Sequence, residues 1–417
     1  MLESFLSKNP LVYVTRDLER ALGLPLNTRG YFIISNFTPF VKSKCKGLNN
    51  ILLIKGKDLL DTHELLSHPQ TKAFLNKLND PRILVFKNTV TIEKICQNNN
   101  WELLNPKSSF ANFVEEKISQ VEWLGPLNKF LPPHEVKTLG EITWPKFAVQ
   151  GKNALPFILQ FNRAHTGSGT YLIRSESELS ELKKKFPKRL ARLTKYIAGP
   201  MFTNNNVVWK NKILVGNINY QITGLSPFTN NPFATIGNDW ALPTKILTKK
   251  QIRSYQRMAE AIGQHLQKNG WRGLFGIDVI LNPEDNKLYL IEINARQPAS
   301  TTYESILQTE VRKKTKKAGL TTFEAHLLSF LDKNIKGASL IKINTGAQII
   351  QKIVKKMPKT KGLEIKISKL KLKYFIYSNT KPESDWLRLQ SRTGVLENHE
   401  KLNSLGKKIK TILTDAL

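Results

Sequence analysis

The segment "KLYLIEINARQPAS", residues 287–300, places three polar side chains at alternate positions after a run of aliphatic residues. They are the carboxylate of Glu292, the amide of Asn294 and the guanidinium of Arg296. Because alternate residues of a β-strand share one face, all three point the same way if the extended backbone continues through Arg296. The segment therefore predicts a buried strand whose last residues present a polar site.

A second apolar strand is expected directly before this one. "GIDVIL", residues 276–281, is followed by the turn "NPEDN", so the two runs predict an antiparallel hairpin. Pairing of Leu281 with Lys287 across the turn places Asp278 opposite about Leu290. Asp278 then lies on the face that carries the polar residues of the second strand.

Two carboxylates, Asp278 and Glu292, and the amide oxygen of Asn294 converge in this hairpin. Hard oxygen ligands of this kind suit Mg²⁺, which binds one or two carboxylates and completes its shell with water and phosphate oxygens. The alternative is that the two carboxylates form ordinary surface salt bridges. The apolar residues between them favour buried strands, where unpaired carboxylates are costly, and so favour the metal site.

A glycine-containing loop is the second motif. "NRAHTGSG", residues 162–169, joins the strand-like runs "PFILQF" and "TYLI". Backbone N–H groups of such a loop can approach phosphate closely. The loop is not a Walker A motif, because it lacks GK[ST] and a strand rather than a helix follows it. By itself it fits an ordinary hairpin loop equally well.

Helical periodicity marks two further segments. In "SSFANFVEEKISQVEWLGPL", residues 108–127, the apolar positions recur at helical spacing, which predicts one helix that ends before the prolines of "LPPHEV". Residues 252–266 carry a second apolar helical face, closed by Gly270.

The order of the elements predicts three parts. Strand-like runs separated by helix-length segments predict an α/β open sheet near the N-terminus, and no GxGxxG motif there supports a dinucleotide site. The predicted boundaries are 1–108 for this domain, 109–335 for the part with the hairpin and the glycine loop, and 336–417 for a small basic C-terminal α/β unit.

Composition limits the classes of function. The 417 residues include 64 Lys or Arg and 33 Asp or Glu, a formal charge of +31, yet no zinc-finger spacing or RNA-binding aromatic motif accompanies the charge, so we do not expect a nucleic-acid partner. Neither a membrane span nor a secretory signal is predicted. Cys45 and Cys96 lie far apart and outside any CxxC motif, which favours a reducing, cytoplasmic setting.

Taken together, these motifs resemble the ATP-grasp superfamily. The resemblance rests chiefly on the block "GIDVIL…YLIEINAR", and also on the preceding helical segment, the glycine-loop hairpin and "KYIAG", residues 195–199. It implies an α/β fold with an N-terminal open-sheet domain before a two-lobed ATP-grasp domain. The activity it implies is the ATP-dependent conversion of a carboxylate to an acyl phosphate, which an amine or other nucleophile then attacks.

The resemblance also implies roles for individual residues. Asp278, Glu292 and Asn294 are expected to hold Mg²⁺ or Mn²⁺ at the ATP phosphates, and Arg296 to face the transferred phosphoryl group as the catalytic residue. Lys117 stands where the family has an early nucleotide-binding lysine. The remaining expected nucleotide contacts are the flexible phosphate loop, His165, Gly167, Ser168, Gly169 and Thr170, and the adenine-side segment, Lys195, Tyr196 and Ile197. For Lys195 and Tyr196 an ordinary strand edge remains an alternative.

The chain departs from the family pattern at one phosphate contact. Many members carry a lysine near the end of the first hairpin strand, where this sequence has Gln160. An amide can donate hydrogen bonds to phosphate but adds no charge. Arg163, three residues further on, is a candidate source of that charge.

Three functions follow, of which the first is the main prediction. It is an ATP- and Mg²⁺-dependent ligase that joins a small-molecule carboxylate, such as an amino acid or peptide, to an amine. The second is an enzyme of the biotin carboxylase or carbamoyl-phosphate synthase kind, and the third a nucleotide-binding regulatory protein without turnover. The sequence leaves the substrates and the oligomeric state open.

Overall fold

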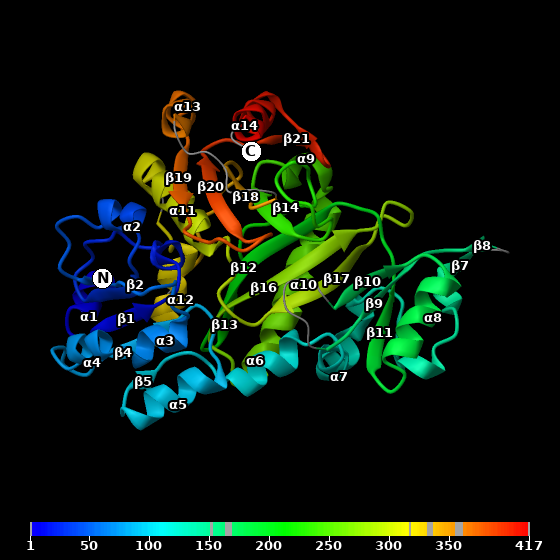
Figure 1. Ribbon diagram of the computed structural model, residues 1–417, viewed down its shortest axis with the longest axis horizontal. Coiled ribbons are helices and arrows are strands. Elements are labelled where there is room, and N and C mark those ends of the chain that lie inside the picture. The colour runs from blue at the N-terminus through cyan, green and yellow to red at the C-terminus, as the bar shows by residue number, and fades with distance from the viewer. Residues whose placement is uncertain are drawn as a thin grey trace.

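The computed structural model describes residues 2–150, 153–162, 169–316, 318–331, 337–354 and 362–415. Three sheets organise them: a parallel sheet near the N-terminus, a small antiparallel sheet, and a large antiparallel sheet between the two (Figure 1). The mixed α/β architecture confirms the predicted fold class.

The N-terminal sheet is parallel, with strand order β3-β2-β1-β4-β5. Its central strand β1, Leu11–Val14, is buried throughout, because Leu11 and Tyr13 enter one hydrophobic cluster and Val12 and Val14 enter another on the opposite face. Burial on both faces is typical of parallel sheets covered by helices. The other strands are β2 Tyr31–Asn36, β3 Ile51–Ile54, β4 Arg82–Val85 and β5 Glu102–Leu103.

The small sheet has strand order β10-β9-β11-β6 and projects from the molecule with helix α8, Glu176–Lys185 (Figure 1). The predicted glycine-loop hairpin is present as β9, Phe157–Gln160, and β10, Thr170–Ile173. Leu159 and Leu193 pack in a cluster with Leu179 of α8, so one face of the sheet is covered. Because side chains alternate along strands, the other face carries Gln160, Arg192 and Thr194. The remaining strands are β6 His134–Thr138 and β11 Leu190–Lys195.

The large sheet has nine strands in the order β17-β16-β12-β14-β15-β18-β20-β19, with β13 paired to β12. Its bounds are β12 Met201–Trp209, β13 Lys212–Leu214, β14 Asn219–Thr223, β15 Thr235–Asp239, β16 Gly273–Leu281, β17 Leu288–Asn294, β18 Ala347–Lys352, β19 Lys373–Ile376 and β20 Asp385–Ser391. Strands β18 to β20 come from the C-terminal part yet continue this sheet through the β15–β18 pair. The boundary at residue 335 stays a prediction.

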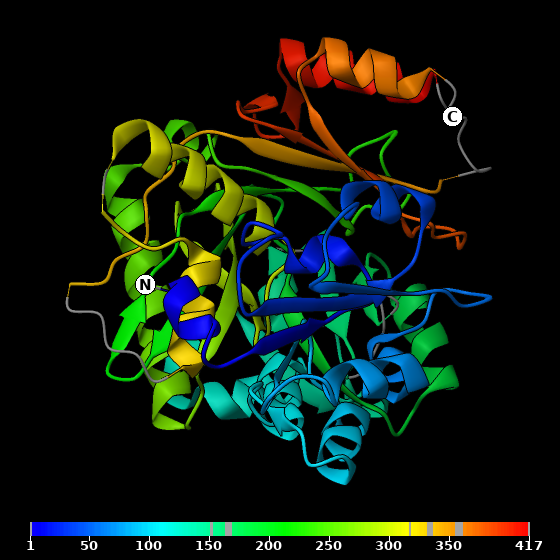
Figure 2. The same cartoon turned by 90° about the vertical axis from the view of Figure 1, so that its left-hand side faces the viewer.

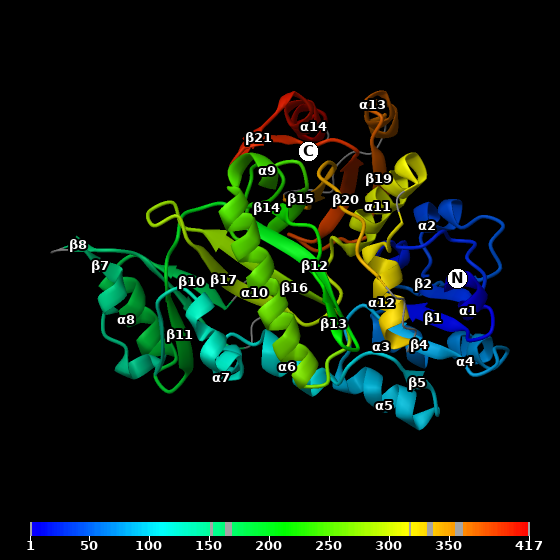
Figure 3. The same ribbon diagram turned by 180° about the vertical axis from the view of Figure 1, so that it is seen from behind.

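Helices cover both faces of the large sheet. Helix α10, Lys249–Lys268, packs along β12 and β16 with the apolar face that its sequence predicts (Figure 3). Helix α12, Thr322–Phe330, also packs on β12 and β16, through Ala325 and Leu328. Because Phe323 and Leu327 of α12 enter a cluster with β1, this helix joins the N-terminal sheet to the large sheet. These two sheets are therefore held in one packed body.

The remaining elements are short or peripheral. Helices α13, Leu363–Lys369, and α14, Ser404–Thr414, lie side by side over the C-terminal strands (Figure 2). The others are α1 Leu2–Leu6, α2 Pro39–Lys44, α3 Thr62–Ser67, α4 Pro69–Leu75, α5 Val90–Asn98, α9 Pro243–Ile246, α11 Thr301–Thr315, β7 Val149–Gln150, β8 Asn153–Ala154, β21 Leu396–Asn398 and β22 Lys401–Leu402.

The prediction of one helix across residues 108–127 was wrong. The structure has two helices, α6 Ser108–Glu115 and α7 Ser119–Leu124, separated by an extended residue at Glu116. Asn162, beside the glycine loop, explains the break, because its side chain accepts a hydrogen bond from the Ile118 amide at 2.9 Å and donates one to the Glu116 carboxylate. Apolar periodicity continues through the break, so the pattern alone did not reveal it.

Candidate functional site

The predicted carboxylates face each other across two strands of the large sheet. Asp278 of β16 pairs directly with Glu292 of β17, and on its other side with Thr203 of β12. The predicted register, with Leu281 opposite Lys287 and Asp278 opposite Leu290, was wrong by two residues at Asp278. Leu281 pairs with Leu288, which accounts for one residue. The pairing shifts by a second residue between Asp278 and Val279, because β17 carries one extra residue there, which forms a β-bulge.

The bulge changes which side chains reach the site. Leu290 and Ile293, three positions apart, are both fully buried in the main core, although strict alternation would place them on opposite faces. Beyond the bulge, Glu292 and Asn294 share the face of Asp278, and the Asn294 amide donates to the Asp278 carboxylate at 3.3 Å. The three predicted metal ligands are therefore in one group.

Cations balance these carboxylates unequally. Burial, reinforced by the adjacent Glu292 carboxylate, raises the pKa of Asp278 to about 6. Burial also acts to raise the pKa of Glu292, but the opposing charges of Lys117 and then Arg296 outweigh it and lower that pKa. Glu292 is therefore the more acidic of the two carboxylates.

Lys117 lies in the break between α6 and α7. Its ammonium is 3.1 Å from the Glu292 carboxylate, and its side chain is largely buried. A continuous helix would carry Lys117 in a different direction, since helical side chains turn by about 100° per residue. The tertiary contacts that break the helix thus bring this lysine to the carboxylates.

Arg296 lies just beyond the end of β17, which stops at Asn294. Its guanidinium donates to the Asn294 amide oxygen at 2.6 Å and forms a short ion pair with Glu115 of α6. Glu115 also pairs with Lys87, at 2.8 Å. The polar row predicted from alternate positions therefore continues through Arg296 by a side-chain contact, although the strand itself does not.

Sequence reasoning missed Arg192, which lies on the small sheet rather than on the hairpin. This arginine of β11 pairs in register with Gln160 and is 3% exposed. Its guanidinium donates to the Gln160 amide oxygen at 3.2 and 2.6 Å. In "LARLTKY" it alternates with apolar residues on a predicted strand, which is a sequence signal that could have identified it.

Of the residues predicted to contact phosphate from the glycine loop, the structure describes two, and both lie at the same small sheet. Gly169 directly precedes β10, Thr170 begins it, and the Thr170 hydroxyl accepts a hydrogen bond from Gln160 at 3.3 Å. Arg163, His165, Gly167 and Ser168 lie outside the described residues. No position for these four enters the geometry of the site.

The segment after β11 connects the small sheet to the large one. The Lys195 ammonium pairs with Glu284 in the hairpin turn at 2.8 Å, Tyr196 is partly exposed, and Ile197 is buried. Gly199 permits a close crossing, because a Cβ there would lie 2.0 Å from the Leu281 carbonyl oxygen. This segment and the large sheet thus meet at the turn end of the hairpin.

Comparison with known proteins identifies the fold. No protein-family model matches the sequence, and no curated protein does. Solved structures match over nearly the whole chain: the N5-carboxyaminoimidazole synthase of Aspergillus clavatus, in complex with ADP and 5-aminoimidazole ribonucleotide, has a TM-score of 0.65 at 14% identity and covers 99% of each chain. The L-amino acid ligase of Bacillus licheniformis has a TM-score of 0.60 at 15% identity, with 98% of this chain and 97% of that chain covered.

Both enzymes belong to the ATP-grasp superfamily. This chain has the ATP-grasp fold. The N5-carboxyaminoimidazole synthetase of Staphylococcus aureus, complexed with ADP, matches similarly, with a TM-score of 0.63 at 14% identity and 97% of each chain covered. The resemblance read from the hairpin is thereby confirmed at the level of the fold.

Two absences in the described segments concern metal ions and membranes. Within those segments, no three or more His, Cys, Asp or Glu side chains gather as a metal site. Among the helices of those segments, none has the length and apolar character that crossing a bilayer requires.

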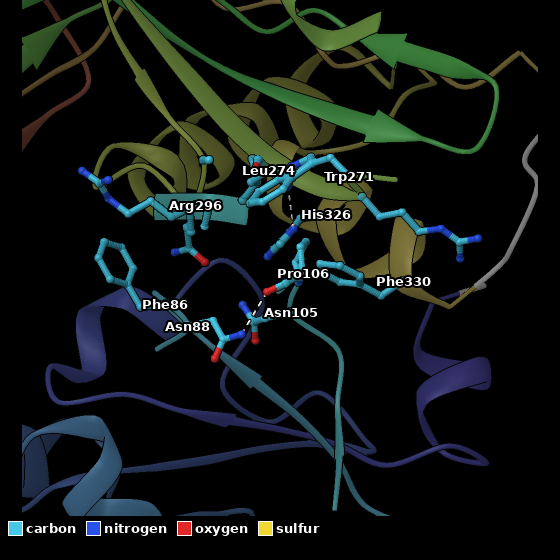
Figure 4. Close-up of a pocket in the computed structure, with 13 residues that line it drawn as sticks. Phe86, Asn88, Asn105, Pro106, Trp271, Leu274, Arg296, His326 and Phe330 are labelled. Atoms are coloured by element: carbon cyan, nitrogen blue, oxygen red, sulfur yellow. Dashed lines mark hydrogen bonds between the residues drawn. The ribbon is translucent and has the colours of Figure 1, made fainter. Parts of the chain in front are cut away.

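A small pocket lies beside the β16–β17 hairpin, where the segments after β4 and β5 meet α12 (Figure 4). His326 of α12 faces this pocket and accepts a hydrogen bond at Nδ1 from the Leu274 amide, at 3.1 Å. Its Nε2 has no hydrogen-bond partner among the described residues. Burial lowers the pKa of His326 to about 3, so the ring is neutral at physiological pH.

We expect His326 to make the stability of this ATP-grasp chain depend on acid. Its pKa is about 3 in the fold, against an ordinary value of 6.5. It therefore contributes stability above pH 6.5 that is lost as pH falls toward 3, because only the unfolded chain binds the proton. Its contribution to the slope reaches at most about 1.4 kcal/mol per pH unit.

Urea unfolding at pH 7 and pH 4.5, on the wild type and on His326→Asn, tests this expectation. The Asn oxygen can still accept from the Leu274 amide but does not titrate. We expect the variant to be less stable at pH 7 and to lose less stability on acidification. Equal losses in the two proteins would contradict the assignment.

Proposed function

We propose that this protein is an ATP- and Mg²⁺-dependent ligase that activates a small-molecule carboxylate as an acyl phosphate for attack by an amine. One observation carries the proposal: the β-bulge of β17 sets Asp278 and Glu292 side by side with Asn294, opposite a buried polar row on the small sheet. Two carboxylates next to an amide, faced by a cation and hydrogen-bond donors, suit a metal–phosphate complex.

Asp278, Glu292 and Asn294 would hold the metal ion. When bound, Mg²⁺ neutralises charge on phosphate oxygens and so favours attack at phosphorus. The position of Lys117 supports a cation site, because its ammonium already lies 3.1 Å from Glu292. In the proposed complex, the metal ion shares the Glu292 carboxylate with Lys117. The Lys117 ammonium then also binds phosphate, as the nucleotide-binding lysine.

The adenine would lie between the small sheet and the segment after β11. Thr194 shares a face with Arg192, and its buried hydroxyl has no hydrogen-bond partner among the described residues. A buried, unsatisfied hydroxyl is costly, and a polar edge of a base would satisfy it. Ile197 and its neighbours Lys195 and Tyr196 would border the ring. The loop residues Arg163, His165, Gly167, Ser168, Gly169 and Thr170 are proposed for the phosphates on sequence grounds.

The proposed reaction has two substitutions. A carboxylate oxygen of the substrate attacks the γ-phosphorus of ATP, and ADP leaves with the electrons of the broken bond. The amine then attacks the acyl carbon, phosphate leaves, and the amine gives up a proton. The role proposed for Arg296 is to bind the reacting oxygens with its planar fork, which positions them and stabilises the developing charge.

The acceptor substrate would bind beyond Arg296, toward the N-terminal domain. The loop that follows is anchored there, since Tyr13 of β1 donates to the Gln297 amide oxygen at 2.8 Å and Arg20 donates to the Ala299 carbonyl oxygen at 3.1 Å. The carboxyl ends of parallel strands are common places for substrates in α/β sheets. A reducing, cytoplasmic setting is also proposed, and the two buried free cysteines are consistent with it.

The names of the similar proteins support two versions of the chemistry. The amino acid ligase supports an amino acid or peptide as the substrate. The carboxyaminoimidazole synthases support a second candidate, in which bicarbonate is the carboxylate and a carboxylated amine is the product. A nucleotide-binding protein without turnover is the third candidate, motivated by Gln160 in place of a lysine.

A phosphate-release screen distinguishes these candidates. We expect ATP and Mg²⁺ to give slow release that a carboxylate–amine pair stimulates, because the acyl phosphate forms only when the carboxylate is bound. Amino acids and dipeptides as stimulants support the ligase, and bicarbonate supports the carboxylating enzyme. Tight ATP binding without any stimulated release supports the binding protein. Absence of both binding and release contradicts the proposal.

A further inference from the structure

Arg192 is a buried cation whose hydrogen-bond partners, among the residues that the structure describes, are all neutral. Besides the two contacts with Gln160, its guanidinium reaches the Gln120 amide oxygen and the Ile291 carbonyl oxygen, each at 3.5 Å. Among the described residues, no carboxylate forms an ion pair with it within 4 Å; the Glu292 carboxylate, which pairs directly with Lys117, acts on it only from a greater distance. Buried charges are normally paired, because desolvation without a counter-charge is costly.

The position of Arg192 shows on which side of the small sheet a bound phosphate would lie. It lies on the face of the small sheet opposite α8, in register with Gln160 and Thr170. Ile291, whose carbonyl it reaches, is the extra residue of the bulge beside Glu292. Arg192 therefore lies between the end of the glycine-loop hairpin and the proposed metal ligands.

Arg192 also fixes the orientation of Gln160. Because the amide oxygen of Gln160 accepts two hydrogen bonds from the guanidinium, its NH₂ group is turned toward Thr170, at 3.3 Å. An amide turned the opposite way would aim its donors at a cation. The Gln160 amide thus presents its donors toward Thr170, and the positive charge of Arg192 lies directly behind it.

We propose that Arg192 supplies, from the neighbouring strand, the positive charge for the nucleotide phosphates that β9 lacks, and that it positions Gln160 as a phosphate donor. This inference rests on the proposed function. It identifies a positioning residue: Arg192 acts on the phosphates through its field and through Gln160. Compared with the family pattern, the positive charge lies on β11 instead of β9, at the residue directly opposite Gln160 in the sheet.

Direct binding of ADP and of adenosine tests the proposal without turnover. In Arg192→Gln, we expect ADP affinity, measured by calorimetry with Mg²⁺, to fall roughly 10- to 100-fold, the range for a lost charge-assisted contact. Adenosine affinity should change less than about threefold, because adenosine carries no phosphate. The matched control is Arg174→Gln, an exposed arginine at the end of β10, which should leave both affinities unchanged.

Two more variants keep the test decisive if Arg192→Gln is unstable. Arg192→Lys keeps the charge but loses the fork to Gln160, so an intermediate ADP affinity is expected. The exchange Arg192→Gln with Gln160→Lys returns the charge to β9 and should recover most of the ADP affinity. If Arg192 has only a structural role, the exchange variant should not recover ADP affinity.

Three results would overturn the assignment. Equal losses of ADP and adenosine affinity would make Arg192 part of the scaffold, and unchanged ADP affinity in a folded Arg192→Gln would show that the phosphates do not sense its charge. Failure of the exchange variant to recover ADP affinity would likewise count against it. Wild-type protein that binds neither ligand would refute the proposed function itself, and this inference with it.

Discussion

Replacing Glu292 by glutamine is expected to lower ATP-dependent phosphate release by roughly 100- to 1000-fold, close to the background of the assay. The substitution keeps the shape of the side chain but removes one of the two carboxylates that meet across β16 and β17. Glu292 is the stronger candidate of the two, because the cations around it lower its pKa and keep it ionised. A metal held by Asp278 and Asn294 alone would have too little opposing charge.

Folding should survive this substitution, since the glutamine oxygen can still accept from Lys117 and the repulsion between the carboxylates is relieved. Thermal unfolding checks this point, and titration of Mg²⁺ in the presence of ADP should show weaker metal binding. Asp285→Asn, in the exposed turn of the same hairpin, is the matched control and should retain wild-type release. Normal turnover in Glu292→Gln would refute the metal-site assignment.

Replacing Arg296 by lysine is expected to lower ligation on the order of 100-fold while ATP affinity stays nearly constant. Arginine binds two oxygens with its planar fork, whereas lysine offers a point charge, so the conservative change removes geometry rather than charge. The structure sharpens the competing explanation. Arg296 pairs with Glu115 of α6, and so could act as a structural ion pair.

Glu115→Gln separates the two explanations, because it removes that ion pair and leaves the guanidinium in place. If Arg296 acts on the substrate, Glu115→Gln should cost at least tenfold less ligation than Arg296→Lys. If both variants lose ligation, ATP affinity and thermal stability to the same degree, Arg296 belongs to the scaffold. Steady-state ligation, ATP calorimetry and unfolding curves, measured on each variant, give the comparison.

Local patterns in the sequence determined the fold class and the core of the candidate site. Strand-like runs separated by helix-length segments predicted the α/β open sheet of the N-terminal part. The structure shows that this sheet is parallel and that its central strand is buried on both faces. The hairpin was readable because its turn and its alternation act over short distances. The convergence of Asp278, Glu292 and Asn294 followed from that hairpin, and the structure brings the three together as predicted.

What the sequence did not reveal depends on contacts between distant segments. The break at Glu116 that directs Lys117 to Glu292 is made by Asn162, a residue more than forty positions away in the chain. No local pattern marks it, since the apolar periodicity runs through the break.

The bulge, the partner of Arg296 and the charge behind Gln160 were likewise decided by tertiary structure. The hairpin was right, but its register was wrong by one residue at the turn, and the bulge added a second without changing which residue types are used. Arg192 and Gln160 are thirty-two positions apart and meet only because β9 and β11 pair. Residue types and short-range alternation are encoded locally, whereas the pairing of charges across strands and domains exists only once the chain is packed.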